Sequence, residues 1–215
     1  MPRESLKNKR ARTEKIIAEL KTAFPDARCS LDYDTPLQLL IATILSAQCT
    51  DERVNAVTKE LFQVYATAES FAEAPQAEIE DLIRSTGFFR NKAKSIRACC
   101  RALVDHHGGR VPDSMESLTA LAGVGRKTAN VVLGNAFGKE EGVVVDTHLG
   151  RISNHLRLTR QKDPVKVEQD LMKVVPRDEW TLFSHLLIRH GRKTCRARKP
   201  DCASCPVRAE CPSAL

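Results

Sequence analysis

Apolar residues recur at spacings of three and four along almost the whole chain, and this period constrains the fold more than any other feature. It predicts helices over 12–23, 36–48, 53–65, 78–85, 91–106, 114–121, 127–137, 148–157, 165–174 and 179–190. The one strand-like run, "GVVV" at 142–145, is too short to found a sheet. The sequence therefore predicts an all-α protein.

Length and charge narrow the class of protein. A chain of 215 residues that is 42% hydrophobic can bury a core as one domain or as two modest ones. Lysine and arginine outnumber the acids 34 to 27, and the net charge of +7 favours a polyanionic partner, either nucleic acid or a membrane surface. No segment approaches the roughly 20 apolar residues that cross a bilayer.

The first residues, "MPRESLKNKRARTEK", are basic and have no apolar segment behind them, so they do not read as a secretory signal. We interpret them as a basic arm, which is either solvated or in contact with DNA phosphates. The eight cysteines are spread too unevenly for a secreted disulfide framework. Cys29, Cys49, Cys99 and Cys100 lie among apolar residues and are predicted to be buried thiols. Reduced thiols indicate a cytoplasmic protein.

The other four cysteines lie close together near the end of the chain. Cys195, Cys202, Cys205 and Cys211 have the spacing C-x6-C-x2-C-x5-C and are predicted to hold a metal. Structural zinc more often uses two C-x2-C pairs, whereas uneven spacing suits a cubane iron–sulfur cluster equally well, so both remain open here. A structural role is expected, in which the metal orders a short loop rich in arginine and lysine.

The stretch "LAGVGRKTANVVL" interrupts an apolar pattern at residues 121–133. We expect one helix to end at Leu121-Ala122, a turn at Gly123-Val124-Gly125, and a new helix to open at Arg126. Free N–H groups at the start of that helix would suit a phosphate. The hairpin is then a clamp for the DNA backbone; the alternative is an ordinary corner between two helices.

A lysine and an aspartate are the candidate catalytic residues. Lys127 lies in the first turn of the expected helix, where the dipole disfavours its ammonium form and so favours a nucleophilic amine. The alternative is a solvated surface lysine. In "VVVDTH", Asp146 is expected to cap the helix that starts near His148, and the same carboxylate could also relay a proton or stabilise positive charge.

Taken together and in this order, "LAGVGRKTANVVL", "VVVDTH" and the four cysteines closely resemble endonuclease III, a family of bifunctional DNA glycosylases in the helix-hairpin-helix superfamily. "LLIATILSAQCTD" and "HGRKTCRARKPDCASCP" are also similar to that family, so the resemblance covers nearly the whole chain. It implies a [4Fe-4S] cluster on the four cysteines and two helical domains with a DNA-binding cleft between them. A barrel of helices would occupy 30–140, with the helix-hairpin-helix at about 114–137, and a cluster domain would combine 1–29 with 141–215.

The resemblance also assigns roles to single residues. It identifies Lys127 as the catalytic lysine, Asp146 as the catalytic aspartate, and Gln48 as the glutamine that fills the space left by a flipped nucleotide. Phe88 stands at the position of a wedge residue and is therefore expected to be exposed, whereas Phe89 is expected to lie in the core. The predicted DNA-binding set also contains Asp51, Gly123, Val124, Gly125, Arg126, Thr128, His148, Arg151, Arg192, Arg198 and Lys199.

Two residues depart from the family pattern. Ala122 replaces the proline that is usual before the hairpin, which loosens the turn without removing any chemistry. Phe88 replaces a leucine wedge, which leaves the preferred lesion open.

The implied function is base excision repair. We expect a monomer that acts at the nucleoid on damaged double-stranded DNA, removes oxidised pyrimidines, and cleaves the strand as an AP lyase through a Schiff base on Lys127. The alternatives are a mismatch-specific thymine glycosylase of the same superfamily and a non-catalytic DNA-binding module. A mismatch adenine glycosylase is disfavoured because that branch lacks a lysine at this position.

Overall fold

In the computed structural model, residues 4–214 are described, and all regular structure within them is helical, which confirms the predicted all-α class. The elements are α1 (Leu6–Ala23), α2 (Pro36–Leu45), α3 (Asp51–Val64), α4 (Ala68–Glu73), α5 (Gln76–Ile83), η1 (Arg84–Thr86), α6 (Phe89–His107), α7 (Met115–Thr119), α8 (Arg126–Phe137), α9 (Thr147–His155), α10 (Pro164–Leu171), η2 (Arg177–Glu179) and α11 (Trp180–Lys193).

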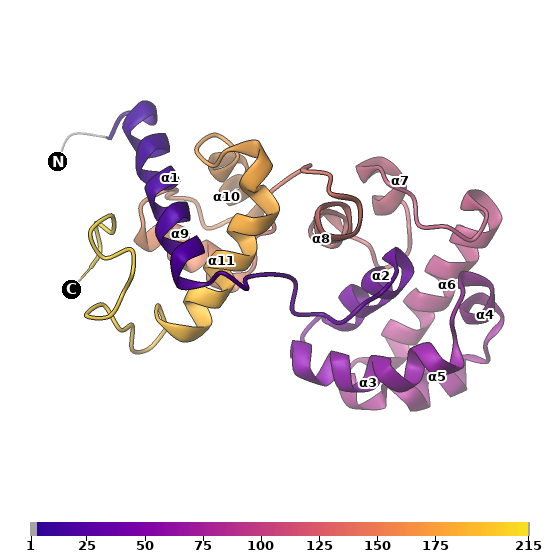
Figure 1. The fold of residues 1–215 in the computed structure, drawn as a ribbon. Helices are drawn as coiled ribbons and strands as arrows, with labels where there is room; N and C mark the ends of the chain where they lie inside the picture. Colours follow the sequence, from indigo (N-terminus) through magenta and orange to yellow (C-terminus); the bar gives the residue numbers. More distant parts are fainter. Residues whose placement is uncertain (1–3, 215) are drawn as a thin grey trace. The chain divides into compact units, whose positions relative to one another are not determined.

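The chain divides into two compact units (Figure 1). The central unit is Cys29–Lys139 and contains α2 to α8. The terminal unit joins the residues up to Arg28 with those from Glu140 onward, so it brings α1 together with α9, α10 and α11. Each unit has its own hydrophobic core.

The core of the central unit is built around α2, which packs against α3, α6 and α8. Leu39, Leu40, Ile41 and Leu45 are all fully buried, as expected of a helix that is apolar on every side. The long helix α6 adds a second buried row and packs against α4 and α5.

The core of the terminal unit lies between α11, α9 and α1. Phe183, Leu186 and Leu187 of α11 and Ile16 and Leu20 of α1 are fully buried. The indole N–H of Trp180, at the start of α11, donates to the carbonyl of Val175 at 3.1 Å, so this large side chain is buried without an unpaired donor.

The expected basic arm is instead the beginning of α1. Ser5 caps this helix by accepting a hydrogen bond from the amide of Asn8 at 3.1 Å, and the helix starts with Leu6. Lys9 and Arg10 donate to the carbonyls of Leu158 and Lys173. Residues 6–15 are therefore part of a helix instead of an arm, and Lys9 and Arg10 bind backbone carbonyls of the same unit. Contact of this segment with DNA phosphates stays a prediction, and residues 1–3 lie outside the described residues.

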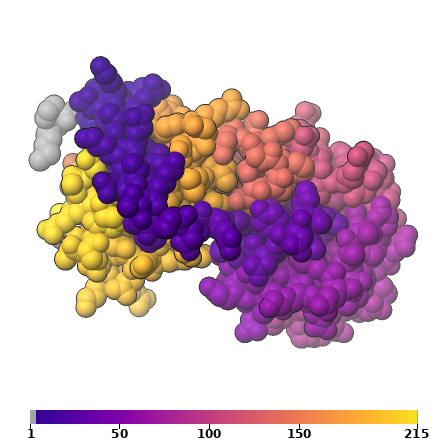
Figure 2. All heavy atoms as spheres, in the orientation of Figure 1, coloured from indigo at the N-terminus to yellow at the C-terminus, as the bar shows by residue number. Residues whose placement is uncertain are grey.

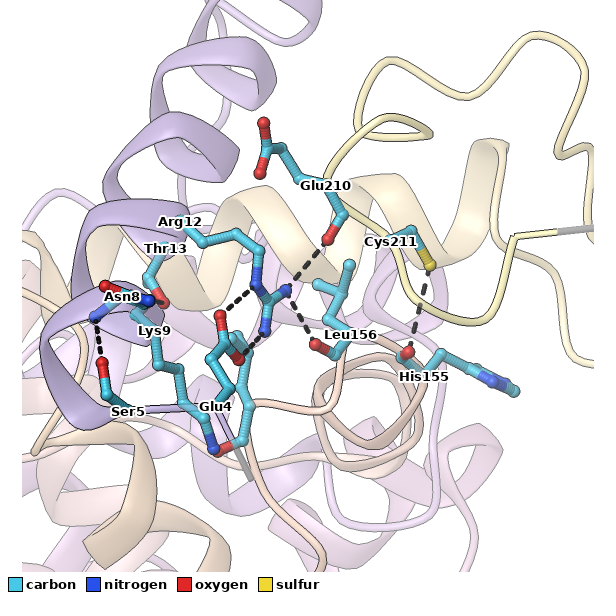
Figure 3. A network of polar contacts seen from close by, with 11 residues as sticks. Glu4, Ser5, Asn8, Lys9, Arg12, Thr13, His155, Leu156, Glu210 and Cys211 are labelled. Carbon is cyan, nitrogen blue, oxygen red and sulfur yellow. Dashed lines mark hydrogen bonds and ion pairs between the residues drawn. The ribbon is translucent and has the colours of Figure 1, made fainter. Parts of the chain in front are cut away.

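Arg12 joins three segments of the terminal unit (Figure 3). Its Nη1 donates to the carbonyls of Leu156 and Glu210, both at 2.9 Å, while Nε and Nη2 donate to the Glu4 carboxylate at 2.9 and 2.8 Å. One guanidinium therefore fastens α1 to the end of α9 and to the residue before Cys211. Figure 2 shows the atoms of α1 beside those of the C-terminal segment.

Several helix ends differ from their predicted positions. α2 stops at Leu45 instead of residue 48, and α7 stops at Thr119 instead of residue 121. The helix α4 was not predicted; Thr67 and Ser70 start it with a reciprocal capping box. Six residues are too few for apolar periodicity to show, so only the cap could have indicated it.

The predictions for the buried thiols are confirmed in part, and the prediction for the valine run is confirmed. Cys99 and Cys100 are fully buried as predicted, but Cys29 and Cys49 are only partly buried, because both lie in loops at the edge of the core. The "GVVV" run forms no strand; the amide of Val144 donates instead to the Ser184 hydroxyl at 3.1 Å.

Among the described residues, no helix is both long enough and apolar enough to cross a membrane.

Replacing Arg12 should weaken the terminal unit. Arg12→Met removes the donors to two carbonyls and to Glu4, and the Arg12 side chain is only 13% exposed, so water replaces them poorly. We expect the free energy of unfolding to fall by about 1–3 kcal/mol and limited proteolysis near Glu210 to speed up. Lys7→Met, an exposed site on the same helix, should change neither measurement. Unchanged stability and protease resistance in Arg12→Met would contradict the role given to this guanidinium.

Candidate functional site

The turn between α7 and α8 is fixed by packing as well as by glycine geometry. Gly123 has φ +77°, and a Cβ there would lie 3.0 Å from Cβ of Ser95 on α6, so a larger residue would strain the backbone and crowd that side chain. Val124 is 5% exposed and anchors the turn in the core. Its amide donates to the Leu121 carbonyl at 3.2 Å. The start of α8 is therefore held firmly against α6, within the central unit.

The helix α8 begins at Arg126, as predicted, and has Gly125 as its N-cap residue with no side-chain cap. The first amides of a helix have no partner within the helix, and a glycine cap leaves them available to an anion. Gly125 is exposed and a Cβ there would meet nothing within 4 Å, so the approach to these amides is open.

Lys127 is the second residue of α8 and is exposed. Its neighbours Arg126 and Thr128 are exposed and half-buried respectively. The first turn of α8 contains no acidic residue, so basic side chains surround the open amides. The primary amine of Lys127 therefore lies beside helix amides that can bind an anion.

Asp146 caps α9, as the sequence predicted. Its Oδ1 accepts a hydrogen bond from the amide of Leu149 at 2.7 Å, and the buried residues Val143 and Val144 lead into it. A carboxylate has about four acceptor positions, so capping leaves most of them unused. Asp146 is half-buried and belongs to the terminal unit, whereas Lys127 belongs to the central unit.

Gln48 and Phe88 lie on two loops of the central unit and share an unusual backbone. Both have left-handed φ angles, +54° and +50°, and both side chains are exposed. Phe88 is 63% exposed, which confirms its expected place outside the core. Phe89 is half-buried against the core, with the Arg84 guanidinium 5.1 Å from its ring centroid. A large exposed apolar ring at a tight bend is available to contact a partner.

Lys92 is a functional candidate that the sequence analysis missed. It is 5% exposed, and its Nζ donates to the carbonyls of Leu45 and Thr86, both at 2.8 Å. Burial lowers the pKa of this amine below its ordinary value. A signal was present, because Lys92 falls on the same helical face as Ile96, Cys99 and Leu103.

The remaining predicted DNA-binding residues differ in exposure. Arg192, on α11, and Arg198 and Lys199, in the loop that follows, are exposed. Asp51, the first residue of α3, accepts a hydrogen bond from the Ser30 hydroxyl at 2.6 Å.

His148 and Arg151 are engaged within the terminal unit. Nδ1 of His148 lies 3.5 Å from Nη2 of Arg151. Nη1 of Arg151 donates to the carbonyl of Cys195 at 2.6 Å, with the sulfur of the same residue 3.8 Å away. The structure thus places Arg151 against the cysteine loop.

The four C-terminal cysteines line one cavity of about 250 Å³ in the terminal unit. Its wall is completed by apolar side chains that include Ile152, Leu156 and Val207. No three His, Cys, Asp or Glu side chains in residues 4–214 converge closely enough to chelate a single ion. All four cysteine side chains nevertheless line the same cavity of the terminal unit.

Groups around the cavity orient the thiols. Nε2 of His190 lies 3.8 Å from the sulfur of Cys205, and burial lowers the pKa of His190 to about 4, so this ring is neutral at pH 7. The sulfur of Cys211 lies 3.9 Å from the carbonyl of His155 (Figure 3). Val207, 2% exposed, is the main apolar anchor of the loop.

Comparison with known proteins agrees with this geometry. The family described as HhH-GPD superfamily base excision DNA repair protein matches residues 41–177. Endonuclease III of Synechocystis sp. is 56% identical over 207 residues, which cover 96% of this chain and 94% of that protein.

Two solved structures are similar along nearly the whole length. One is a non-covalent endonuclease III–DNA complex, and the other is a trapped endonuclease III–DNA covalent intermediate. Each is 44% identical, has a TM-score of 0.89, and is matched over 95% of this chain and 96% of its own. With its glycine turn, exposed lysine and matching length, this chain belongs to the HhH-GPD superfamily of base excision DNA repair proteins.

Proposed function

We propose that this chain is a base-excision-repair DNA glycosylase and AP lyase that removes oxidised pyrimidines from duplex DNA, with Lys127 as its nucleophile. The observation that carries the proposal is the exposed Lys127 amine one residue inside a helix whose glycine-capped start is open to a phosphate. The similar endonuclease III structures, one of them a covalent DNA intermediate, support the same reaction class.

The hairpin holds the DNA backbone without reading its sequence. Amides at the start of α8 donate hydrogen bonds to a phosphate, and Arg126 and Thr128 flank it. Because phosphate contacts position a duplex but do not specify bases, recognition of the lesion comes from other residues.

The gap in the duplex is formed and filled by Phe88 and Gln48. An oxidised pyrimidine stacks weakly and is therefore cheaper to extrude than an intact base. The exposed Phe88 ring enters the base stack as a wedge, and base–aromatic stacking of about 1–3 kcal/mol offsets part of the unstacking cost. Gln48 occupies the space that the extruded nucleotide leaves.

Lys127 then attacks C1′ of the extruded nucleotide. As the bond from Nζ to C1′ forms, the bond from C1′ to the base breaks, and the base leaves with the electron pair and is protonated. The sugar opens to an iminium on Nζ. Loss of a C2′ proton breaks the bond from C3′ to its phosphate and nicks the strand, after which water hydrolyses the iminium and frees the lysine.

Asp146 assists this reaction in one of two ways. Its unused acceptor positions either take the proton that Lys127 must lose or balance the positive charge that develops on the sugar. The amide of Leu149 holds the carboxylate in one orientation, so the same hydrogen bond serves the helix cap and the chemistry.

The cysteine-lined cavity would hold a [4Fe-4S] cluster. Four cysteines around one cavity provide the all-thiolate ligand set that such a cluster takes, and the similarity to endonuclease III supports a cluster over zinc. When bound, the cluster would order the loop that carries Arg198 and Lys199 and would take no part in a reaction step. The protein is proposed to act as a monomer at the nucleoid.

Removing the nucleophile should separate binding from catalysis. Lys127→Ala is expected to abolish excision of thymine glycol and adduct trapping by borohydride, while binding to the same duplex stays within a few-fold, because phosphate contacts elsewhere supply most of the affinity. Lys166→Ala removes a lysine from the first turn of α10 and should leave both properties intact. Excision by Lys127→Ala near the wild-type rate would mean that another nucleophile acts.

The same assay, with a panel of single lesions, tests the substrate class. Faster turnover of a G·T mismatch than of any oxidised pyrimidine would favour a mismatch-specific thymine glycosylase instead.

Loss of one cluster ligand should unfold the C-terminal loop. We expect purified wild-type protein to be yellow-brown and to contain about four irons per chain, and Cys202→Ser or Cys205→Ser to be colourless and poorly folded. The reason is that the loop buries little apolar surface beyond Val207. Cys29→Ala, in the central unit, should keep the colour. Stoichiometric zinc in protein made under iron-replete conditions would overturn the assignment.

A further inference from the structure

The side chain of Lys92 connects the two loops that carry Gln48 and Phe88. We propose that Lys92 is a positioning residue that couples these loops, so that Phe88 and Gln48 enter the duplex as one unit. This inference rests on the proposed function, and it adds to that function a residue with no direct part in the chemistry.

On one side, Lys92 holds the backbone before and after the Phe88 bend. Its Nζ donates to the carbonyl of Thr86 at 2.8 Å, and its own amide donates to the carbonyl of Phe88 at 3.1 Å. Gly87 and Phe88 between these points both have left-handed φ angles, +69° and +50°. For a phenylalanine this backbone is uncommon, so it persists where neighbouring contacts enforce it.

On the other side, Lys92 holds the start of the Gln48 loop. The second hydrogen bond of Nζ goes to the carbonyl of Leu45, the last residue of α2. A short turn follows, in which the amide of Cys49 donates to the Ser46 carbonyl at 3.1 Å and Gln48 takes a left-handed φ. The loop is thus anchored at its beginning by the same ammonium group that anchors the Phe88 bend.

The setting of Nζ fits positioning and excludes a nucleophilic role. Lys92 is 5% exposed and donates to two carbonyls that close helical segments, where the negative end of the helix dipole favours a cation. Burying a charge is unfavourable, and burial lowers the pKa of this amine. A methionine would fill the same space without burying a charge. The ammonium group is therefore explained by its hydrogen bonds to the carbonyls of Leu45 and Thr86, which join the two loops.

Insertion can be measured without turnover. The probe is a duplex with a tetrahydrofuran abasic analogue opposite 2-aminopurine, whose fluorescence rises when the base is unstacked. Wild-type protein should give a full rise. Lys92→Met should lose most of that rise and bind about tenfold more weakly, as should Phe88→Ala, which removes the wedge itself. Lys94→Met, an exposed lysine on the same helix, should behave as wild type.

A second readout separates coupling from general damage. Cleavage at an abasic site in single-stranded DNA needs no wedge or gap filler, so Lys92→Met should retain it within about twofold. If Lys92→Met is unfolded, Lys92→Gln, which can still donate to one carbonyl, is measured in its place with the same outcomes.

A full fluorescence rise with the Lys92 variant would overturn the inference. So would an equal loss of single-strand cleavage, or no rise with the wild-type protein. Because the fluorescence does not depend on base release, an inactive wild-type protein that still gives the rise would reject the proposed function alone.

Discussion

The close approach of Gly123 to Ser95 is the contact on which the proposed chemistry depends. A Cβ on Gly123 would lie only 3.0 Å from Cβ of Ser95, so the turn before α8 packs closely on α6, and Val124 beside it is buried in the core. The amides that open α8, and the Lys127 amine one residue further, are thereby carried on a rigid part of the central unit. A nucleophile must be placed to within a fraction of an ångström, and packing of this kind supplies that placement.

Two lysines of the central unit show how surroundings decide the role of one chemical group. Lys92 is buried, and its ammonium satisfies two carbonyls at the ends of helical segments. Lys127 is exposed at the opposite kind of helix end, where amides point outward and a cation gains nothing from the dipole. The first holds backbone in place, and the second is available to react.

The sequence was sufficient where a residue's role depends on its immediate neighbours. Helical periodicity located most helices, the "VVVDTH" stretch indicated the Asp146 cap, and the match of Phe88 to the family's wedge position indicated an exposed ring. The sequence failed where a role depends on contacts between distant segments. Arg12 looked like part of a basic arm because its partners, Leu156 and Glu210, are more than a hundred residues away. For Lys92 the helical pattern indicated burial, but its partner Leu45 is distant in the chain, so the sequence did not indicate what the ammonium joins. Spacing alone also could not decide between zinc and a cluster, and it is the similarity to endonuclease III that supports the cluster.

Mapping the covalent adduct on the wild-type protein tests the assignment of the nucleophile most directly. The protein is incubated with a duplex containing thymine glycol in the presence of borohydride, digested with a protease and a nuclease, and examined by mass spectrometry. A single modified peptide with the sugar remnant on Lys127 is the predicted result. A remnant on any other amine, or release of the base with no trapped adduct, would contradict the assignment.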